Sequence, residues 1–186
     1  MQLRVMAMLL AMTLAPACSQ SVAPPVETST PEAPPVPIVQ LDPAKGAILP
    51  VSKTERLARQ CSRKSPGPVT GTWSPTRTMI ADLEFTLGEE LEQKLKAIPE
   101  AGAKPQDYYR QYAGLLIDGR QVIYINGVHN SVIDRDLARE QGAGRPQRGL
   151  WSNEPVMICD GGTLTFGVEY DPATKAFDRF AFNGRL

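Results

Sequence analysis

The chain has 186 residues, with 20 Lys and Arg, 20 Asp and Glu and a single His, so its formal net charge at pH 7 is zero. Proteins that bind nucleic acids need a clear basic excess to neutralise phosphates, and this composition argues against that class. With the terminal segments described below set aside, roughly 130 residues remain, which suits one domain around a single core.

The first 17 residues are typical of a bacterial export signal. Arg4 supplies a positively charged start, Val5 to Leu14 form an apolar run, and Ala15-Pro16-Ala17 brings small residues up to a cleavage point. We therefore predict a signal peptide over residues 1–17, whose removal would leave Cys18 as the new N-terminus.

Cys18 resembles the lipidated cysteine of bacterial lipoproteins, which carries acyl chains such as palmitate on its sulfur and nitrogen. The match departs from the usual pattern, because Leu14 lies four residues before the cysteine instead of three. Ordinary cleavage after Ala17 would give a soluble periplasmic protein instead. Ser19 is not the aspartate associated with inner-membrane retention, so we expect an anchor in the outer membrane, facing the periplasm. No second apolar run approaches the roughly 20 residues of a membrane span.

The two other cysteines are predicted to form a disulfide. Cys61 and Cys159 make an even pair in an oxidising compartment, where a disulfide is the usual state. The alternative is a pair of buried free thiols. One histidine and no CxxC pair are too few ligands for a zinc site, and we expect neither a metal nor a cofactor.

Residues 18–50 are predicted to be a tether between the lipid and a domain over residues 51–186. Prolines of the kind that favour extended, polyproline-like chain recur through this stretch. They are Pro24, Pro25, Pro31, Pro34, Pro35, Pro37, Pro43 and Pro50.

The domain is expected to begin with helix. Val51 to Arg63 allows one or two turns near Cys61. Ser74 as N-cap and Pro75 then open a helix of about six turns that ends before Pro99. Its apolar residues recur at spacings of three and four, which gives one continuous stripe. They are Ile80, Leu83, Leu87, Leu91, Leu95 and Ile98.

From residue 108 the pattern changes to alternating strands. Asp118-Gly119 is typical of a two-residue hairpin turn. The predicted strands are Tyr108–Ile117, Arg120–Asn126, Pro155–Cys159, Thr163–Tyr170 and Lys175–Asn183. This arrangement predicts an α+β fold, in which one long amphipathic helix packs on an antiparallel sheet of about five strands. In outline it is similar to a cystatin-like roll.

Four phrases of the sequence resemble those of small proteobacterial envelope lipoproteins that have no assigned role. They are Tyr108-Tyr109-Arg110-Gln111-Tyr112-Ala113-Gly114, Cys159-Asp160-Gly161-Gly162, Phe166-Gly167-Val168-Glu169-Tyr170-Asp171 and Phe182-Asn183-Gly184. The resemblance spans residues 60 to 184. It implies an exported single-domain protein and brings no catalytic residues with it.

The candidate catalytic groups have simpler structural roles. His129 and Ser131 are two residues apart, which does not present a nucleophile to a base in a triad. Asp160, Glu169 and Asp171 are the carboxylates that could serve a peptidoglycan hydrolase, but two of them begin turns and Glu169 occupies a polar strand position. We expect no catalytic residues.

The segment Gly127–Asn153 is the best candidate for a binding surface, because it is long for a connection in a compact domain. It contains a possible short helix over Ser131–Gln141, and then Arg145, Arg148 and Trp151, residue types that dominate binding hot spots. Trp151 could instead fill the core.

The aromatic residues Trp73, Tyr108, Tyr109, Tyr112 and Tyr124 could line a glycan groove, although antiparallel sheets bury aromatics routinely. We therefore expect a noncatalytic envelope lipoprotein that binds or inhibits a macromolecular partner. The alternative function is a peptidoglycan-active hydrolase.

Overall fold

The structure is a computed structural model that describes residues 39–143 and 150–184. The predicted signal peptide, Cys18, most of the predicted tether, Arg145 and Arg148 lie outside the described residues. The described residues belong to one compact unit.

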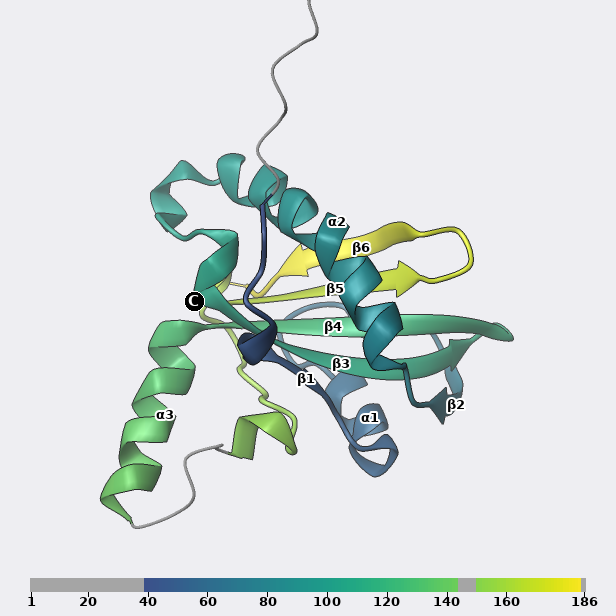
Figure 1. The fold of residues 1–186 in the computed structure, drawn as a ribbon, viewed down its shortest axis with the longest axis horizontal. Helices are drawn as coiled ribbons and strands as arrows, with labels where there is room; N and C mark the ends of the chain where they lie inside the picture. Colours follow the sequence, from purple (N-terminus) through teal and green to yellow (C-terminus); the bar gives the residue numbers. More distant parts are fainter. Residues whose placement is uncertain (1–38, 144–149, 185–186) are drawn as a thin grey trace, which may run out of the picture. The chain divides into compact units, whose positions relative to one another are not determined.

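The fold is α+β, and its centre is a mixed six-stranded sheet in the order β1-β3-β4-β5-β6, with β2 also paired with β3. All neighbours are antiparallel except β1, which runs parallel to β3. β1 pairs with the first half of β3 and β2 with its second half (Figure 1). The strands are β1 (Gly46–Ile48), β2 (Val69–Trp73), β3 (Tyr108–Ile117), β4 (Arg120–His129), β5 (Thr165–Asp171) and β6 (Ala176–Phe182).

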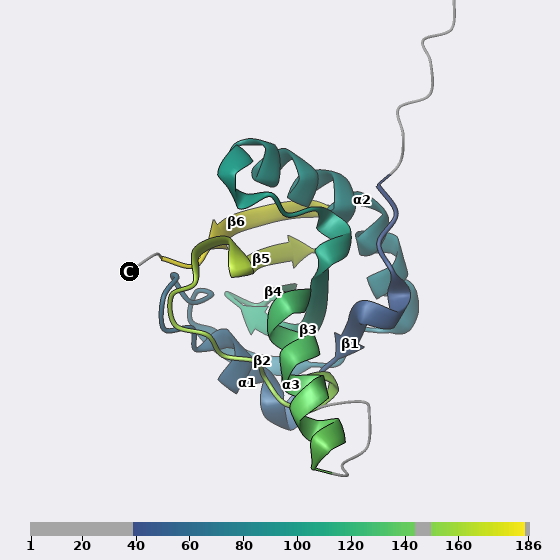
Figure 2. The same cartoon turned by 90° about the vertical axis from the view of Figure 1, so that its left-hand side faces the viewer.

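Three α-helices of the described residues pack around the sheet. They are α1 (Val51–Ala58), α2 (Arg77–Lys96) and α3 (Asn130–Gly142). The helices α1 and α2 lie on opposite sides of the sheet, and α3 projects from the end of β4 (Figure 2).

The alternation of side chains along β3 decides which helix each residue meets. Tyr108 and Tyr112 point to the α2 side and pack with buried leucines of that helix. Leu115 and Ile117 point to the other side and pack with Leu57 of α1. The predicted stripe of α2 is buried from Ile80 to Leu95, whereas Ile98 lies beyond the end of the helix and is half-buried.

Both predicted hairpins are confirmed. Asp118 and Gly119 have φ values of 51° and 74°, as a type I′ turn requires, and Ile117 pairs with Arg120. In the β5–β6 hairpin the Asp171 carboxylate accepts hydrogen bonds from the backbone of the turn residues that follow it.

The predicted tether boundary is wrong, because residues 46–48 belong to the sheet. Pro43 lies in a 3-10 helix and Pro50 precedes α1, so the prolines flank a short proline-free strand instead of excluding it. The sheet therefore has six strands instead of five and is not purely antiparallel. The helix α2 also begins later than predicted, with Thr76 as its N-cap in place of Ser74.

The predicted strand Pro155–Cys159 is wrong as well. This segment belongs to no strand, and side-chain amides, not a neighbouring strand, hold part of its backbone. Those amides come from residues distant in sequence. An extended apolar run therefore could not show whether the segment pairs with a strand or is held by side chains.

Gly88 is required in α2 by its contact with the chain that enters the domain. A Cβ added there would lie 2.3 Å from the carbonyl oxygen of Val39. Gly88→Ala should therefore lower the free energy of unfolding by about 1–3 kcal/mol, because it would push the backbone at Val39 away from α2. At an exposed helix position the same change would stabilise by up to about 1 kcal/mol. Urea unfolding decides the sign, with Gln93→Ala at an exposed site of the same helix as the control. A stabilised Gly88→Ala would contradict this packing.

Candidate functional site

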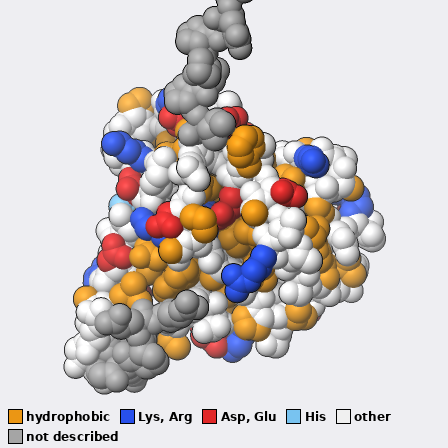
Figure 3. Space-filling view, in the orientation of Figure 1, with side chains coloured by type: hydrophobic (Ala, Val, Ile, Leu, Met, Phe, Trp, Pro, Cys, Tyr) orange, Lys and Arg blue, Asp and Glu red, His pale blue; other side chains and the backbone are white. Residues whose placement is uncertain are grey.

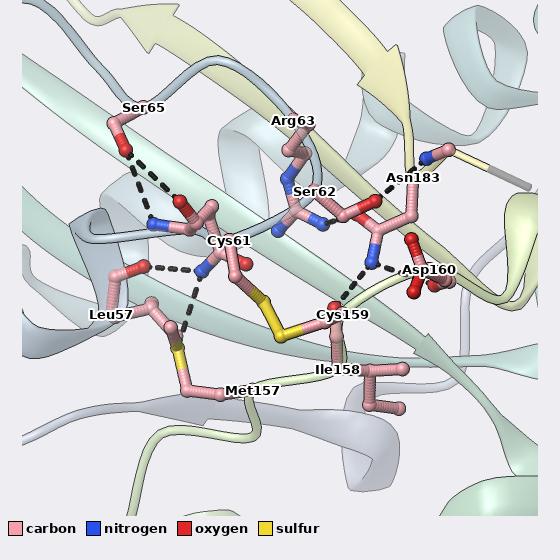
Figure 4. The surroundings of a disulfide bond; sticks show 12 residues. Leu57, Cys61, Ser62, Arg63, Ser65, Met157, Ile158, Cys159, Asp160 and Asn183 are labelled. Carbon is pink, nitrogen blue, oxygen red and sulfur yellow. Dashed lines mark hydrogen bonds between the residues drawn. A yellow bond between two sulfur atoms is a disulfide. The ribbon is translucent and has the colours of Figure 1, made fainter. Parts of the chain in front are cut away.

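Cys61 and Cys159 form a disulfide, as predicted, with their Cα atoms 5.3 Å apart. Both cysteines are exposed, so the alternative of buried free thiols is wrong. The bond ties the chain that leaves α1 to the segment that precedes β5 (Figure 4).

Next to the disulfide, Arg63 is buried and bonded to neutral acceptors. Its Nε donates to the Tyr124 hydroxyl at 3.0 Å, and its two Nη atoms donate to the amide oxygens of Asn183 and Asn126 at 2.5 Å. A Cβ on Gly167 would lie 2.4 Å from both Arg63 Nε and the Tyr124 hydroxyl, so this position on β5 leaves room for the guanidinium. These contacts give Arg63 a structural role.

The amides around Arg63 hold the segment that follows residue 150. Asn126 Nδ2 donates to the carbonyl of Val156 at 3.0 Å, and the Val156 N–H donates to Gln111 Oε1 at 2.9 Å. Asn183 Nδ2 donates to the carbonyls of Ile158 and Asp160, as Figure 4 shows. Buried amides thus replace a strand ladder.

Each of the three candidate carboxylates has a structural role of its own. Glu169 pairs with Arg179 at 3.2 Å, and burial raises the pKa of its carboxyl even though Arg179 lowers it. Asp171 caps its turn and pairs with Arg120 at 3.4 Å. Asp160 lies in a turn before β5 with a φ of 71°. Among the described residues, no group of three or more His, Cys, Asp or Glu could hold a metal ion. This arrangement gives no support to the hydrolase alternative.

His129 ends β4 and helps to start α3. Its Nδ1 accepts a hydrogen bond from the Ser131 backbone N–H at 3.2 Å and lies 2.9 Å from the Ser131 hydroxyl. Its ring packs edge-on against Tyr108. The pair therefore joins the end of β4 to the start of α3.

A cavity of about 890 Å³ lies beside β1, between α2 on one side and Leu137, Trp151, Ser152 and Asn153 on the other. Its volume is within the range of ligand sites. Its walls include Ile48, Ile80, Tyr109, Tyr112 and Trp151, and its charged lining residues are Arg77 and Glu84. Figure 3 shows hydrophobic side chains gathered on the face of the molecule on which β1 and α2 lie, with acidic and basic groups between them.

The Glu84 carboxylate in the lining of this cavity is neutralised by a buried arginine. Glu84 accepts hydrogen bonds from Arg110 Nε at 2.8 Å and from the Tyr112 hydroxyl, and Arg110 Nη2 lies 2.8 Å from the same carboxylate oxygen in an ion pair. Arg110 also donates to the backbone carbonyls of Tyr108 and Asp42. Burial raises the pKa of Tyr112 well above its ordinary value, although Arg110 lowers it, so the hydroxyl stays neutral. Because these groups are bonded to one another, they have a structural role and none is poised for acid–base chemistry. The cavity is therefore better suited to binding than to catalysis.

Trp151 is neither a core residue nor a free surface residue. It is half-buried, packs edge-on against Tyr109 with 4.8 Å between ring centroids, and gives its backbone carbonyl to Gln111 Nε2 at 2.6 Å. It also lines a second cavity of about 590 Å³ next to α3 and α1. The candidate residue is therefore placed on a hollowed surface.

The structure reveals site residues that the sequence analysis had not singled out. Arg77, Ile48 and Glu84 line the cavity because β1 joins β3 beside the start of α2. Of the aromatic candidates, Tyr108, Tyr112 and Tyr124 are buried, and Trp73 and Tyr109 are half-buried. The amphipathic pattern of α2 could have marked Arg77 as exposed, but nothing local indicated a strand at residues 46–48.

Comparisons of this chain with family models, with curated proteins and with solved structures gave no match. Among the helices of residues 39–143 and 150–184, none has the length and hydropathy of a membrane span.

Proposed function

We propose that this chain is a noncatalytic cell-envelope lipoprotein whose domain binds or inhibits a macromolecular partner. The observation that carries the proposal is the cavity beside β1. It is large and walled by the aromatic rings of Tyr109 and Trp151, and the Glu84 carboxylate and the Tyr112 hydroxyl of its lining are bonded to one another and to Arg110. Aromatic anchors in a pocket favour binding, because they bury much area at little conformational cost.

The proposed setting is the periplasmic face of the outer membrane, with a lipid anchor at Cys18. The signal-like first 17 residues and the resemblance to proteobacterial lipoproteins support it, and so does an exposed disulfide, which suits an oxidising compartment. The similarity in outline to a cystatin-like roll is part of the same proposal, and it concerns topology alone.

The anchor is tested by the intact mass of the protein purified from bacterial envelopes with detergent. We expect the mass of the chain from Cys18 onward plus that of its acyl groups, and Cys18→Ala should abolish the added mass. A mature chain with an unmodified Cys18 would show that the protein is not a lipoprotein, and it would leave the soluble periplasmic form as the explanation.

Partner binding is tested by a photo-reactive amino acid placed at Asn153, which is exposed and lines the cavity. Irradiated envelopes should yield a discrete cross-linked species, whose amount falls at least tenfold with Trp151→Ala. The control places the same group at Lys175, exposed in the β5–β6 turn. Cross-links of equal yield at both positions, or yields insensitive to Trp151→Ala in a folded protein, would rule out the cavity as the partner site.

A further inference from the structure

The outer edge of β1 is directed into the cavity. β1 has one neighbour in the sheet, β3, because the order begins with β1. The backbone N–H of Leu49 donates to the carbonyl of Tyr112 at 2.9 Å, so Leu49 faces β3. Successive residues of a strand turn their backbone groups to opposite sides, and the N–H and C=O of Ile48 therefore face away from β3.

Such an edge is a template for another strand. Ile48 lines the cavity and is half-buried, and the cavity has a wall on each side of β1. Ile80 and Ala81 of α2 form one wall, and Tyr109 and Trp151 belong to the other. An extended chain laid along β1 would point alternate side chains at these two walls, as strand addition requires.

The charge of the lining selects the occupant. Glu84 is paired with Arg110, whereas Arg77 is exposed and takes part in none of the ion pairs of the described residues. Beside the wall, Lys45 lies 5.4 Å from the centroid of the Tyr109 ring, and Asp42 acts on the same ring with the opposite charge. Asp134 also lies beside this wall, where it accepts a hydrogen bond from the Tyr109 hydroxyl at 3.1 Å. Among the residues that line the cavity itself, the charge left without an ion pair is that of Arg77.

We propose that β1 binds an extended, acidic segment of a partner polypeptide as an added edge strand. Its backbone would bond to Ile48, its apolar side chains would enter the aromatic wall, and a carboxylate would pair with Arg77. This inference rests on the proposed binding function and names the chemistry of the partner.

The probe is a set of ten-residue peptides selected from a random display library on the full-length protein in detergent. We expect acidic sequences with apolar residues at every second position. Methylation of backbone nitrogens along the best peptide should weaken binding at least tenfold at alternate positions and leave the intervening positions nearly unchanged. That period of two reports main-chain pairing, which a side-chain pocket would not produce.

Two pairs of variants locate the added strand. Ile48→Pro removes the N–H that points away from β3. Because that N–H makes no hydrogen bond within the sheet, an edge strand can accept proline there, and the variant should fold but no longer bind the peptide. Ala47→Pro removes an N–H that faces β3 and should reduce stability instead. Arg77→Glu should weaken binding at least tenfold, whereas Lys96→Glu, the same charge change at an exposed site of the same helix, should not.

Three results would overturn the inference. Peptide binding that tolerates every N-methylation and Ile48→Pro would exclude strand addition, and sensitivity to Trp151→Ala would then still leave the cavity as a binding site. A library that yields no binder, while the Asn153 cross-link persists, would exclude an extended peptide but not a partner. A concentration-dependent dimer that blocks peptide binding would make a second copy of this chain the occupant.

Discussion

Replacing Glu84 by Leu is expected to lower the free energy of unfolding by about 3–5 kcal/mol, because it leaves the guanidinium of Arg110 buried without a carboxylate. The Arg110 side chain is 0% exposed and that of Glu84 12% exposed, so water can solvate neither charge well. Urea unfolding of the full-length chain measures the loss. The same network reaches the backbone carbonyl of Asp42, so the variant should also loosen the chain that leads into β1.

Two controls separate a buried charge from a lost contact. Glu92→Ala breaks the exposed pair with Lys96 on the same helix and should cost less than about 1 kcal/mol. The double variant Glu84→Leu with Arg110→Met removes both charges and should recover much of the stability, since replacing a whole buried pair by apolar groups is often tolerated. A Glu84→Leu chain no less stable than Glu92→Ala would contradict the buried pair.

The elements predicted well are those whose signal is local. The stripe of α2 repeats every three or four residues through the helix, and Asp118-Gly119 places the turn of the β3–β4 hairpin. The far end of β4 was predicted at Asn126, but the strand continues to His129. The disulfide followed from parity and compartment and needed no geometry. In each case the signal lies in a few neighbouring residues or, for the disulfide, in the number of cysteines.

The elements predicted poorly depend on partners far along the chain. β1 has three residues, too few for an alternation to be seen, and its pairing with β3 spans more than sixty positions. Pro155–Cys159 has the composition of a strand, yet amides from Asn126 and Asn183 hold its backbone. The β-propensity of a segment cannot show whether its backbone is bonded to side-chain amides or to a neighbouring strand.

The candidate site was predicted in part for the same reason. Trp151 was singled out by residue type, and the structure places it in the wall of two cavities. Its neighbour Tyr109 lies 42 positions earlier, and the sequence offered both a groove and core packing for its ring. The cavity arises because β1 places Ile48 between that wall and α2, a juxtaposition that no stretch of sequence contains.

Removing the disulfide is expected to have an effect of similar size to the loss of Glu84. Cys61 and Cys159 are 98 positions apart, and the loop-closure model gives about 4–5 kcal/mol for a loop of this length. Cys61→Ala with Cys159→Ala should therefore shift the urea midpoint strongly. Because both cysteines are exposed, a thiol reductant should reproduce the shift in the unmodified chain.

The bond and the amide network hold the same segment, so their effects should not be additive. Asn183→Ala removes the hydrogen bonds to the carbonyls of Ile158 and Asp160 on either side of Cys159. In the oxidised chain the disulfide still holds this segment, whereas in the cysteine-free chain the same change should free it. We therefore expect Asn183→Ala to cost more without the disulfide, by about 0.5–3 kcal/mol of coupling. An equal loss in the free energy of unfolding with and without the disulfide would mean that the bond acts only on the unfolded chain. A constraint on the entropy of the unfolded chain does not depend on the contacts that Asn183 makes in the folded protein.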